Sequence, residues 1–127
     1  MRRSLTVSIA IVFLILSVGL FCEGAAGEAA RHYQGRLTEI NARLQQAEWT
    51  EARQMLLALS SQWEKESGWM QLWIHHAETV AVSHALRGLI ASAQAEDPLS
   101  CQLYFDECME NFDHLHHRDA FTLKNIL

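Results

Sequence analysis

The N-terminal run "LTVSIAIVFLILSVGLFC", residues 5–22, has no charged side chain and limits what this chain can fold into more than any other feature. Arg2 and Arg3 precede the run, and Glu23 follows it. As a helix the run is about 27 Å long, close to the hydrocarbon thickness of a bilayer. It therefore predicts a transmembrane helix over residues 5–22. Because basic flanks stay in the cytoplasm, residues 1–4 are expected inside and the rest outside.

A cleaved signal peptide is the second interpretation of the same run. The small residues in "EGAAGEAA" offer a cleavage site after Ala26, and the protein would then be secreted. The apolar region of a signal peptide is usually only about 7–15 residues long, so the length favours retention. Bulky Leu20 and Phe21 precede Cys22 where a lipoprotein needs small residues. We therefore expect a single-pass protein of the cell membrane, with secretion as the alternative.

The charge balance narrows the choice of partners. The chain carries a net charge of −5 with neutral histidines, and two of its cations, Arg2 and Arg3, belong to the membrane segment. The outer part is therefore more acidic still. An acidic surface repels phosphates, which argues against nucleic acid as a partner and against electrostatic docking on anionic lipid.

Apolar residues recur at helical spacing in four segments after residue 23, and the chain has only one proline, Pro98. Such stripes predict amphipathic helices. The first stripe consists of Tyr33, Leu37, Ile40, Leu44 and Ala47. The second helix is expected to begin near Trp49 or Thr50, with the stripe Trp49, Ala52, Leu56, Leu59 and Trp63.

Two sequence signals mark where the remaining helices begin and end. Gly68 is expected to separate the second helix from a third that ends near Ala95. One face of that third helix would carry Leu72, His76, Thr79, Ser83, Leu86, Ile90 and Ala93, widened by Trp69, Trp73 and Val80. Asp97 as N-cap and Pro98 as first residue predict the start of the fourth helix. It would end near Arg118 and carry the stripe Cys101, Phe105, Cys108, Phe112 and Leu115.

Together these segments predict an all-α fold, an N-terminal transmembrane helix followed by a small antiparallel bundle of about four helices over residues 23–118. The second and fourth helices would return toward the membrane. This brings the turn near Gly68 close to the bilayer, together with an apolar C-terminal tail, residues 119–127. The tail is too short to start a stable helix of its own. Leu123, Ile126 and Leu127 are expected to pack under the bundle; the alternative is contact with lipid or a partner.

The tryptophans allow two interpretations. Trp63, Trp69 and Trp73 lie near the predicted membrane-proximal turn. Aromatic residues are enriched at membrane interfaces, which would make them lipid contacts. Packing in the core at helical spacing is the default expectation.

The cysteines of the fourth helix are predicted to be core residues. Cys101 and Cys108 share one face, and seven residues separate them by about 10.5 Å along the axis. A disulfide requires Cα atoms within about 7 Å, so the two cannot bridge each other. An intermolecular disulfide or metal ligation is the alternative, although no C-x-x-C motif occurs.

Histidines supply the candidate metal site. An antiparallel pairing of the third and fourth helices would place His76 opposite His117, with His75 and His114 nearby. These four imidazoles could hold a transition metal such as zinc, or sense pH near their usual pKa of about 6.5. The competing interpretation, which we favour, makes His76 a hydrogen-bonded core residue and the others cations at a helix end. No zinc-protease, P-loop or nucleophile-elbow motif occurs. We expect no enzyme and no cofactor.

Three stretches carry a family resemblance: "AEWTEARQMLLALSSQWEK", "WIHHAE" and the terminal "FTLKNIL". With them the chain resembles a domain-of-unknown-function family of short, membrane-tethered bacterial proteins, found mainly in Gram-positive spore formers. The resemblance implies the architecture and the location and carries no activity. His76 matches the family's histidine, whereas His75 and His116 replace an acidic residue and a proline and so depart from the pattern.

Two functions follow as hypotheses. The preferred one is a non-enzymatic interaction module of the cell envelope, tethered through residues 5–22, that binds another envelope protein or its own copy. The alternative is an envelope metal-binding or pH-sensing protein that uses the four histidines.

Overall fold

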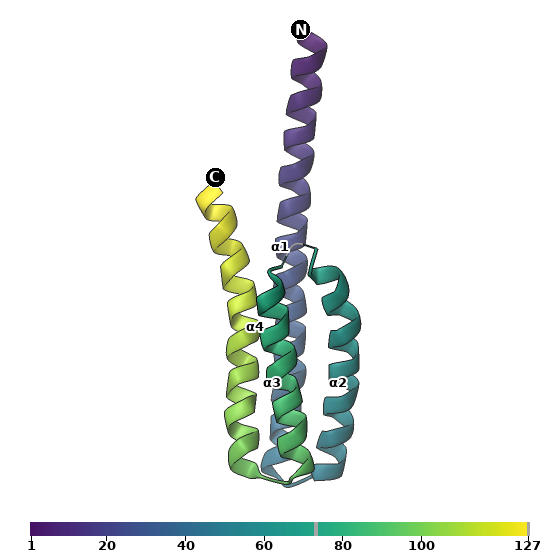
Figure 1. Ribbon diagram of the computed structural model, residues 1–127, viewed down its shortest axis with the longest axis vertical. Helices are drawn as coiled ribbons and strands as arrows, with labels where there is room; N and C mark the ends of the chain where they lie inside the picture. The colour runs from purple at the N-terminus through teal and green to yellow at the C-terminus, as the bar shows by residue number, and fades with distance from the viewer. Residues whose placement is uncertain (73, 127) are drawn as a thin grey trace.

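The computed structural model describes the backbone of residues 1–72 and 74–126, and the side chains of residues 1–22, 24–72 and 74–115. This part of the chain contains four helices and no strand: α1 (Arg2–Gln45), α2 (Trp49–Met70), α3 (His76–Gln94) and α4 (Pro98–Ile126). The all-α prediction is confirmed (Figure 1).

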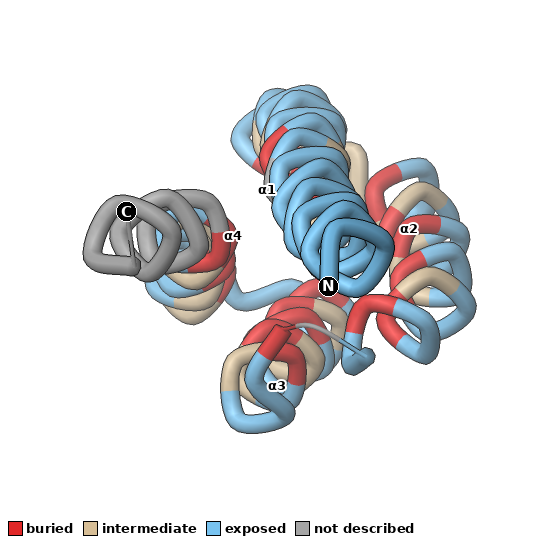
Figure 2. Tube along the Cα trace, turned by 90° about the horizontal axis from the view of Figure 1, so that it is seen from above, coloured by how far each residue is buried: buried red, intermediate tan, exposed pale blue. Residues whose placement is uncertain are grey.

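The four helices form a bundle in which each helix is antiparallel to its two neighbours. α1 packs against α2 and α4, and α3 packs against the same two helices (Figure 2). The N-terminal half of α1 rises out of the bundle, and the α2–α3 joint lies at that end. The α1–α2 and α3–α4 turns lie at the opposite end (Figure 1). The predicted antiparallel order of the helices is therefore confirmed.

The predicted membrane segment and the first bundle helix form one continuous helix of 44 residues. Burial in the bundle begins near Ala26 and Ala30, each only 3% exposed. Their small side chains let the neighbouring helices approach the α1 backbone closely. The predicted boundary at residues 22–23 therefore lies inside one helix. The side chains of this helix are mostly exposed before the boundary and become buried in the bundle soon after it.

Three of the predicted stripes form the core. The first, second and fourth stripes are buried at Tyr33, Leu37, Ile40, Leu44, Ala52, Leu56, Leu59, Trp63, Cys101, Cys108, Phe112 and Leu115. Trp49 and Phe105 are half-buried against them. Ala47 is exposed, because it lies in the α1–α2 turn with a positive φ of 58°.

The prediction for the third helix is wrong in its expected start after Gly68 and in the N-terminal part of its stripe, whereas Thr79, Leu86 and Ala93 are buried as predicted. α2 continues through Gly68 to Met70, and α3 begins only at His76. A glycine inside a helix costs only about 1 kcal/mol relative to alanine, and burying Met70 offsets that cost. α3 is rotated from the predicted face: Leu72, His76 and Val80 are exposed, and its buried residues are Thr79, Val82, Ala85, Leu86, Leu89, Ser92 and Ala93.

Both turns at the far end use a left-handed residue to end the preceding helix. Ala47 has φ 58° and Glu96 has φ 53°. The N–H of Glu48 donates to the carbonyl of Arg43 at 3.0 Å, and the N–H of Asp97 donates to that of Ser92 at 3.1 Å. This is the pattern of a Schellman cap, which normally favours glycine at the left-handed position.

The predicted start of α4 is confirmed. Pro98 is its first residue, and the Asp97 carboxylate accepts from the Ser100 hydroxyl at 2.7 Å and from the Ser100 N–H at 3.4 Å. These hydrogen bonds lower the pKa of Asp97, because they favour its charged form. The cap thus directs α4 back along the bundle.

The predicted end of α4 near Arg118 is wrong, because the helix continues to Ile126. A tail of this length cannot start a stable helix by itself, but here it only elongates an existing helix and needs no new nucleus. No glycine or proline interrupts it. The side chains of Leu123, Ile126 and Leu127 lie outside the described residues, so their packing stays a prediction.

Candidate functional site

The exposed half of α1 is the first candidate. An 18-residue window of this helix has a mean hydropathy of 2.7, and none of it is buried against the protein. By length and composition α1 can cross a membrane, the only helix of the described chain that can. The change from bare apolar surface to buried surface occurs within a few residues of Ala26.

An aromatic cluster fills the centre of the bundle. The rings of Tyr33 and Phe112 stack with centroids 5.2 Å apart and an interplanar angle of 5°. The Trp63 ring meets both rings edge-on, at 5.4 Å and 5.3 Å. Because the three rings come from α1, α2 and α4, this cluster joins three helices at one level.

Each polar atom of this cluster has a partner. The Tyr33 hydroxyl donates to Glu66 Oε2 at 2.6 Å, and the Trp63 indole N–H donates to Ser83 Oγ at 2.9 Å, which brings in α3. Burial first, and then the Glu66 carboxylate, raises the pKa of Tyr33 far above its ordinary 10.0. The phenol therefore stays protonated as a fixed donor, and the cluster has a structural role.

α3 and α4 pair within one residue of the predicted register, in which His76 lies opposite His117. Asn111 Nδ2 donates to the Ala81 carbonyl at 3.2 Å. Gly88 faces the Tyr104 ring so closely that a Cβ atom on Gly88 would lie 2.7 Å from Cζ and nearer still to Cε1 and Cδ1. The missing side chain of Gly88 is what lets the two helices approach.

The structure does not gather the predicted histidines into a site. His75 and His76 are exposed where α3 begins, so the expectation that His76 is a core residue is wrong. His114 is also exposed, with Nε2 4.0 Å from Glu110 Oε1. Within the described side chains, no three histidine, cysteine or acidic residues lie close enough together to hold a metal. His117 lies outside the described side chains, so the four-histidine site stays a prediction.

The cysteines of α4 are core residues, as predicted. Cys101 and Cys108 are buried with free thiols. Burial raises the pKa of both, that of Cys108 to about 12. Because the thiolate is the reactive form, these thiols are poor nucleophiles at neutral pH.

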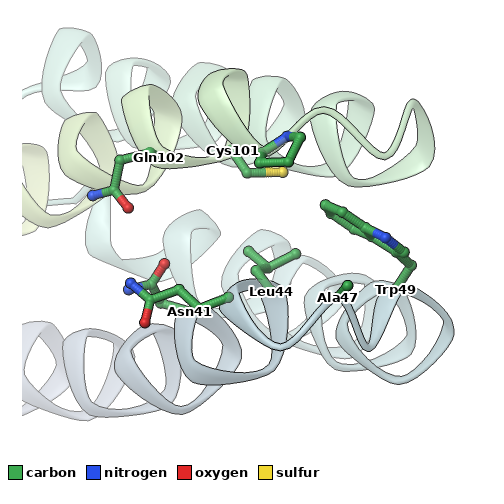
Figure 3. A pocket seen from close by; sticks show the side chains of 8 residues that line it. Asn41, Leu44, Ala47, Trp49, Cys101 and Gln102 are labelled. Carbon is green, nitrogen blue, oxygen red and sulfur yellow. The ribbon is translucent and has the colours of Figure 1, made fainter.

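A groove that the sequence did not reveal lies at the far end of the bundle. We call it the distal groove; its volume is about 300 Å³, and it is lined by Asn41, Leu44, Gln45, Ala47, Trp49, Pro98, Cys101 and Gln102. Figure 3 shows the Trp49 ring and Leu44 beside Cys101, with the amides of Asn41 and Gln102 at the other end. The groove can accept a small apolar group while amides bond to its polar edge. Leu99 and Leu103 are exposed nearby in sequence on α4. The one signal in the sequence is that Trp49 begins the second stripe, directly after a turn.

The comparisons with known proteins give one family. The model of a family described as a domain of unknown function (DUF4363) matches residues 26–126. No curated protein and no solved structure matches the chain. The matched region begins where α1 becomes buried, so the family domain corresponds to the bundle.

Proposed function

Because the chain belongs to the DUF4363 family, a domain of unknown function, we propose that it is a membrane-tethered, non-enzymatic interaction module of the cell envelope. The observation that carries the proposal is the continuity of α1. One unbroken helix is bare and apolar in its first half and buried in the bundle from Ala26 onward. In this proposal the bundle stands on the membrane as a rigid extension of the anchor.

The proposed orientation places the bundle outside the cytoplasm. Arg2 and Arg3 would remain on the cytoplasmic side, following the positive-inside rule. From Ala26 to the end of α1 the helix rises about 30 Å. The distal groove is therefore the part of the bundle farthest from the membrane, where another envelope protein can reach it.

Retention of the anchor also suits the packing. Cleavage after Ala26 would remove Ala26 itself, a buried residue of the core. It would also leave the new N-terminus beside Ala30 in the middle of a helix.

A binding role agrees better with the described side chains than a catalytic one. The Tyr33 phenol is held as a hydrogen-bond donor, and the two thiols of α4 are buried and protonated. The distal groove offers apolar surface and neutral amides, which are groups suited to recognition. We propose that its occupant is an apolar side chain of another envelope protein or of a second copy.

Site-specific photocrosslinking in intact cells tests the proposal. A photoreactive residue at Gln102, which lines the distal groove, should give a defined adduct in the membrane fraction. The matched control is the same residue at Ala58, exposed midway along α2. Equal adducts from both positions would contradict a specific binding surface, and a chain found in the soluble fraction would contradict the tether.

A further inference from the structure

We propose that the membrane-proximal end of the bundle makes a second contact with lipid, in which Leu72 enters the membrane interface beside α1 and Trp69 lies at the outer border of that interface. The inference rests on the proposed tether and adds a site to it. We call these two residues the proximal pair. The contact would set the tilt and the roll of the bundle, which a single helix leaves free.

The proximal pair is exposed although its neighbours are fixed in the core. Leu72 is 83% exposed, the highest value for a large hydrophobic side chain described outside residues 1–21, and Trp69 is 43% exposed. Met70 and Ile74 are buried, and the Ile74 N–H donates to the Met70 carbonyl at 2.8 Å. The joint is therefore anchored on both sides of Leu72, which keeps this apolar side chain exposed at the membrane-proximal end.

The packing of α1 against α2 gives the height of this pair relative to the anchor. Tyr33 meets Trp63 and Glu66 across the two helices. Counting from those contacts toward the membrane brings Leu72 level with residues 24–27 of α1, just beyond the last residue of the apolar run. At 1.5 Å per residue this is about 3–8 Å from the end of the run. The same count brings Trp69 level with residues 27–30, about 8–12 Å from the end of the run. Polar headgroup layers extend roughly 5–7 Å beyond the hydrocarbon core on each side, so Leu72 reaches that layer and Trp69 lies at its outer border.

The chemistry of the pair fits this layer. Tryptophan is enriched at membrane interfaces because its large ring is amphipathic. The net charge of −5 offers no general attraction to anionic lipid, so the contact should form on zwitterionic lipid and persist in high salt. Figure 1 shows the α2–α3 joint beside α1 at the point where α1 leaves the bundle.

Fluorescence quenching by lipid tests the contact in the full chain. The chain is reconstituted in phosphatidylcholine vesicles whose acyl chains are brominated near the headgroup, and in unbrominated vesicles. The emission of Trp69 is the difference between the native chain and its Trp69→Phe variant, and the emission of Trp49 is obtained in the same way from Trp49→Phe. Trp49 is the matched control, since it begins α2 at the far end of the bundle. We expect bromine to lower the Trp69 emission and to leave that of Trp49 unchanged, in low and high salt.

Leucine variants provide the second arm. Leu72→Asp should restore the Trp69 emission in brominated vesicles, whereas Leu57→Asp should not, because Leu57 is exposed midway along α2. Unquenched Trp69 in a chain that floats with the vesicles would overturn the second contact and leave the tether standing. Equal effects of the two aspartate variants would also overturn it. A chain that does not float would overturn the tether and the contact together.

Discussion

Alanine at Gly88 should destabilise the bundle, although the same change stabilises most helices. Replacing a glycine inside a helix by alanine normally gains about 0.5–1 kcal/mol. At Gly88 the new Cβ would lie 2.7 Å from Tyr104 Cζ and closer still to two other ring atoms. Overpacking of this kind costs about 1–3 kcal/mol. We expect a net loss of up to about 2.5 kcal/mol in the free energy of unfolding.

Two other glycines of the same chain are matched controls. Gly35 and Gly68 lie inside helices, and no neighbouring helix comes within 4 Å of the place that a Cβ atom would take. Their alanine variants should gain about 0.5–1 kcal/mol. Urea unfolding of the full chain in detergent micelles, followed by tryptophan emission, measures all three. A Gly88→Ala chain as stable as Gly35→Ala would refute the close α3–α4 approach.

A double-mutant cycle assigns the effect to Tyr104. Once Tyr104 is alanine, Gly88→Ala should no longer destabilise and should show the gain of the controls. The coupling energy between the two positions is expected in the usual range for touching residues, about 0.5–3 kcal/mol. Additive effects would place the cost somewhere other than the Tyr104 ring.

Three further changes test other parts of the fold by the same unfolding assay. Ala47→Gly should stabilise by roughly 1 kcal/mol by relieving the left-handed backbone, whereas Ala91→Gly, inside α3, should cost about as much. Tyr33 has a raised pKa in the fold, so its contribution is complete below pH 10.0 and is lost above it. The native chain should therefore lose more stability than Tyr33→Phe between pH 9 and 11, and equal losses would count against the buried phenol. Replacing Cys101 and Cys108 by alanine should cost about 1–3 kcal/mol, and a peptide map showing a bond between them would be incompatible with α4.

The sequence predicts best the helices whose apolar residues fall on a single stripe. In α2, α4 and the bundle half of α1 the large apolar residues concentrate on one stripe and the charged residues lie mostly off it, so one rotation buries most of the apolar surface. α3 carries alanine, leucine and valine on two overlapping stripes, and its rotation depends on which stripe the neighbours can approach most closely. Gly88 against Tyr104 is one such close approach, a contact between helices that spacing within one helix cannot show.

Helix ends and grooves are harder to predict for a related reason. Gly68 predicts a break in the helix and Arg118 predicts a helix end, yet α2 and α4 run through these positions. Adding a residue to an existing helix costs little free energy compared with starting a new one. The distal groove forms where three helix ends meet, so Asn41, Trp49 and Gln102 become neighbours only in the bundle. By contrast, the α3–α4 register is predictable to within one residue because Asp97 and Pro98 fix the turn.

The intact mass of the protein recovered from cells tests the central proposal, the membrane tether, most directly. We predict a chain that retains residues 1–26, fractionates with the membrane and resists extraction at high pH. That result would mean that α1 retains its exposed apolar half together with the half that packs in the bundle. A mass that begins at Gly27, with the protein free in the medium, would contradict the tether and favour the secreted alternative.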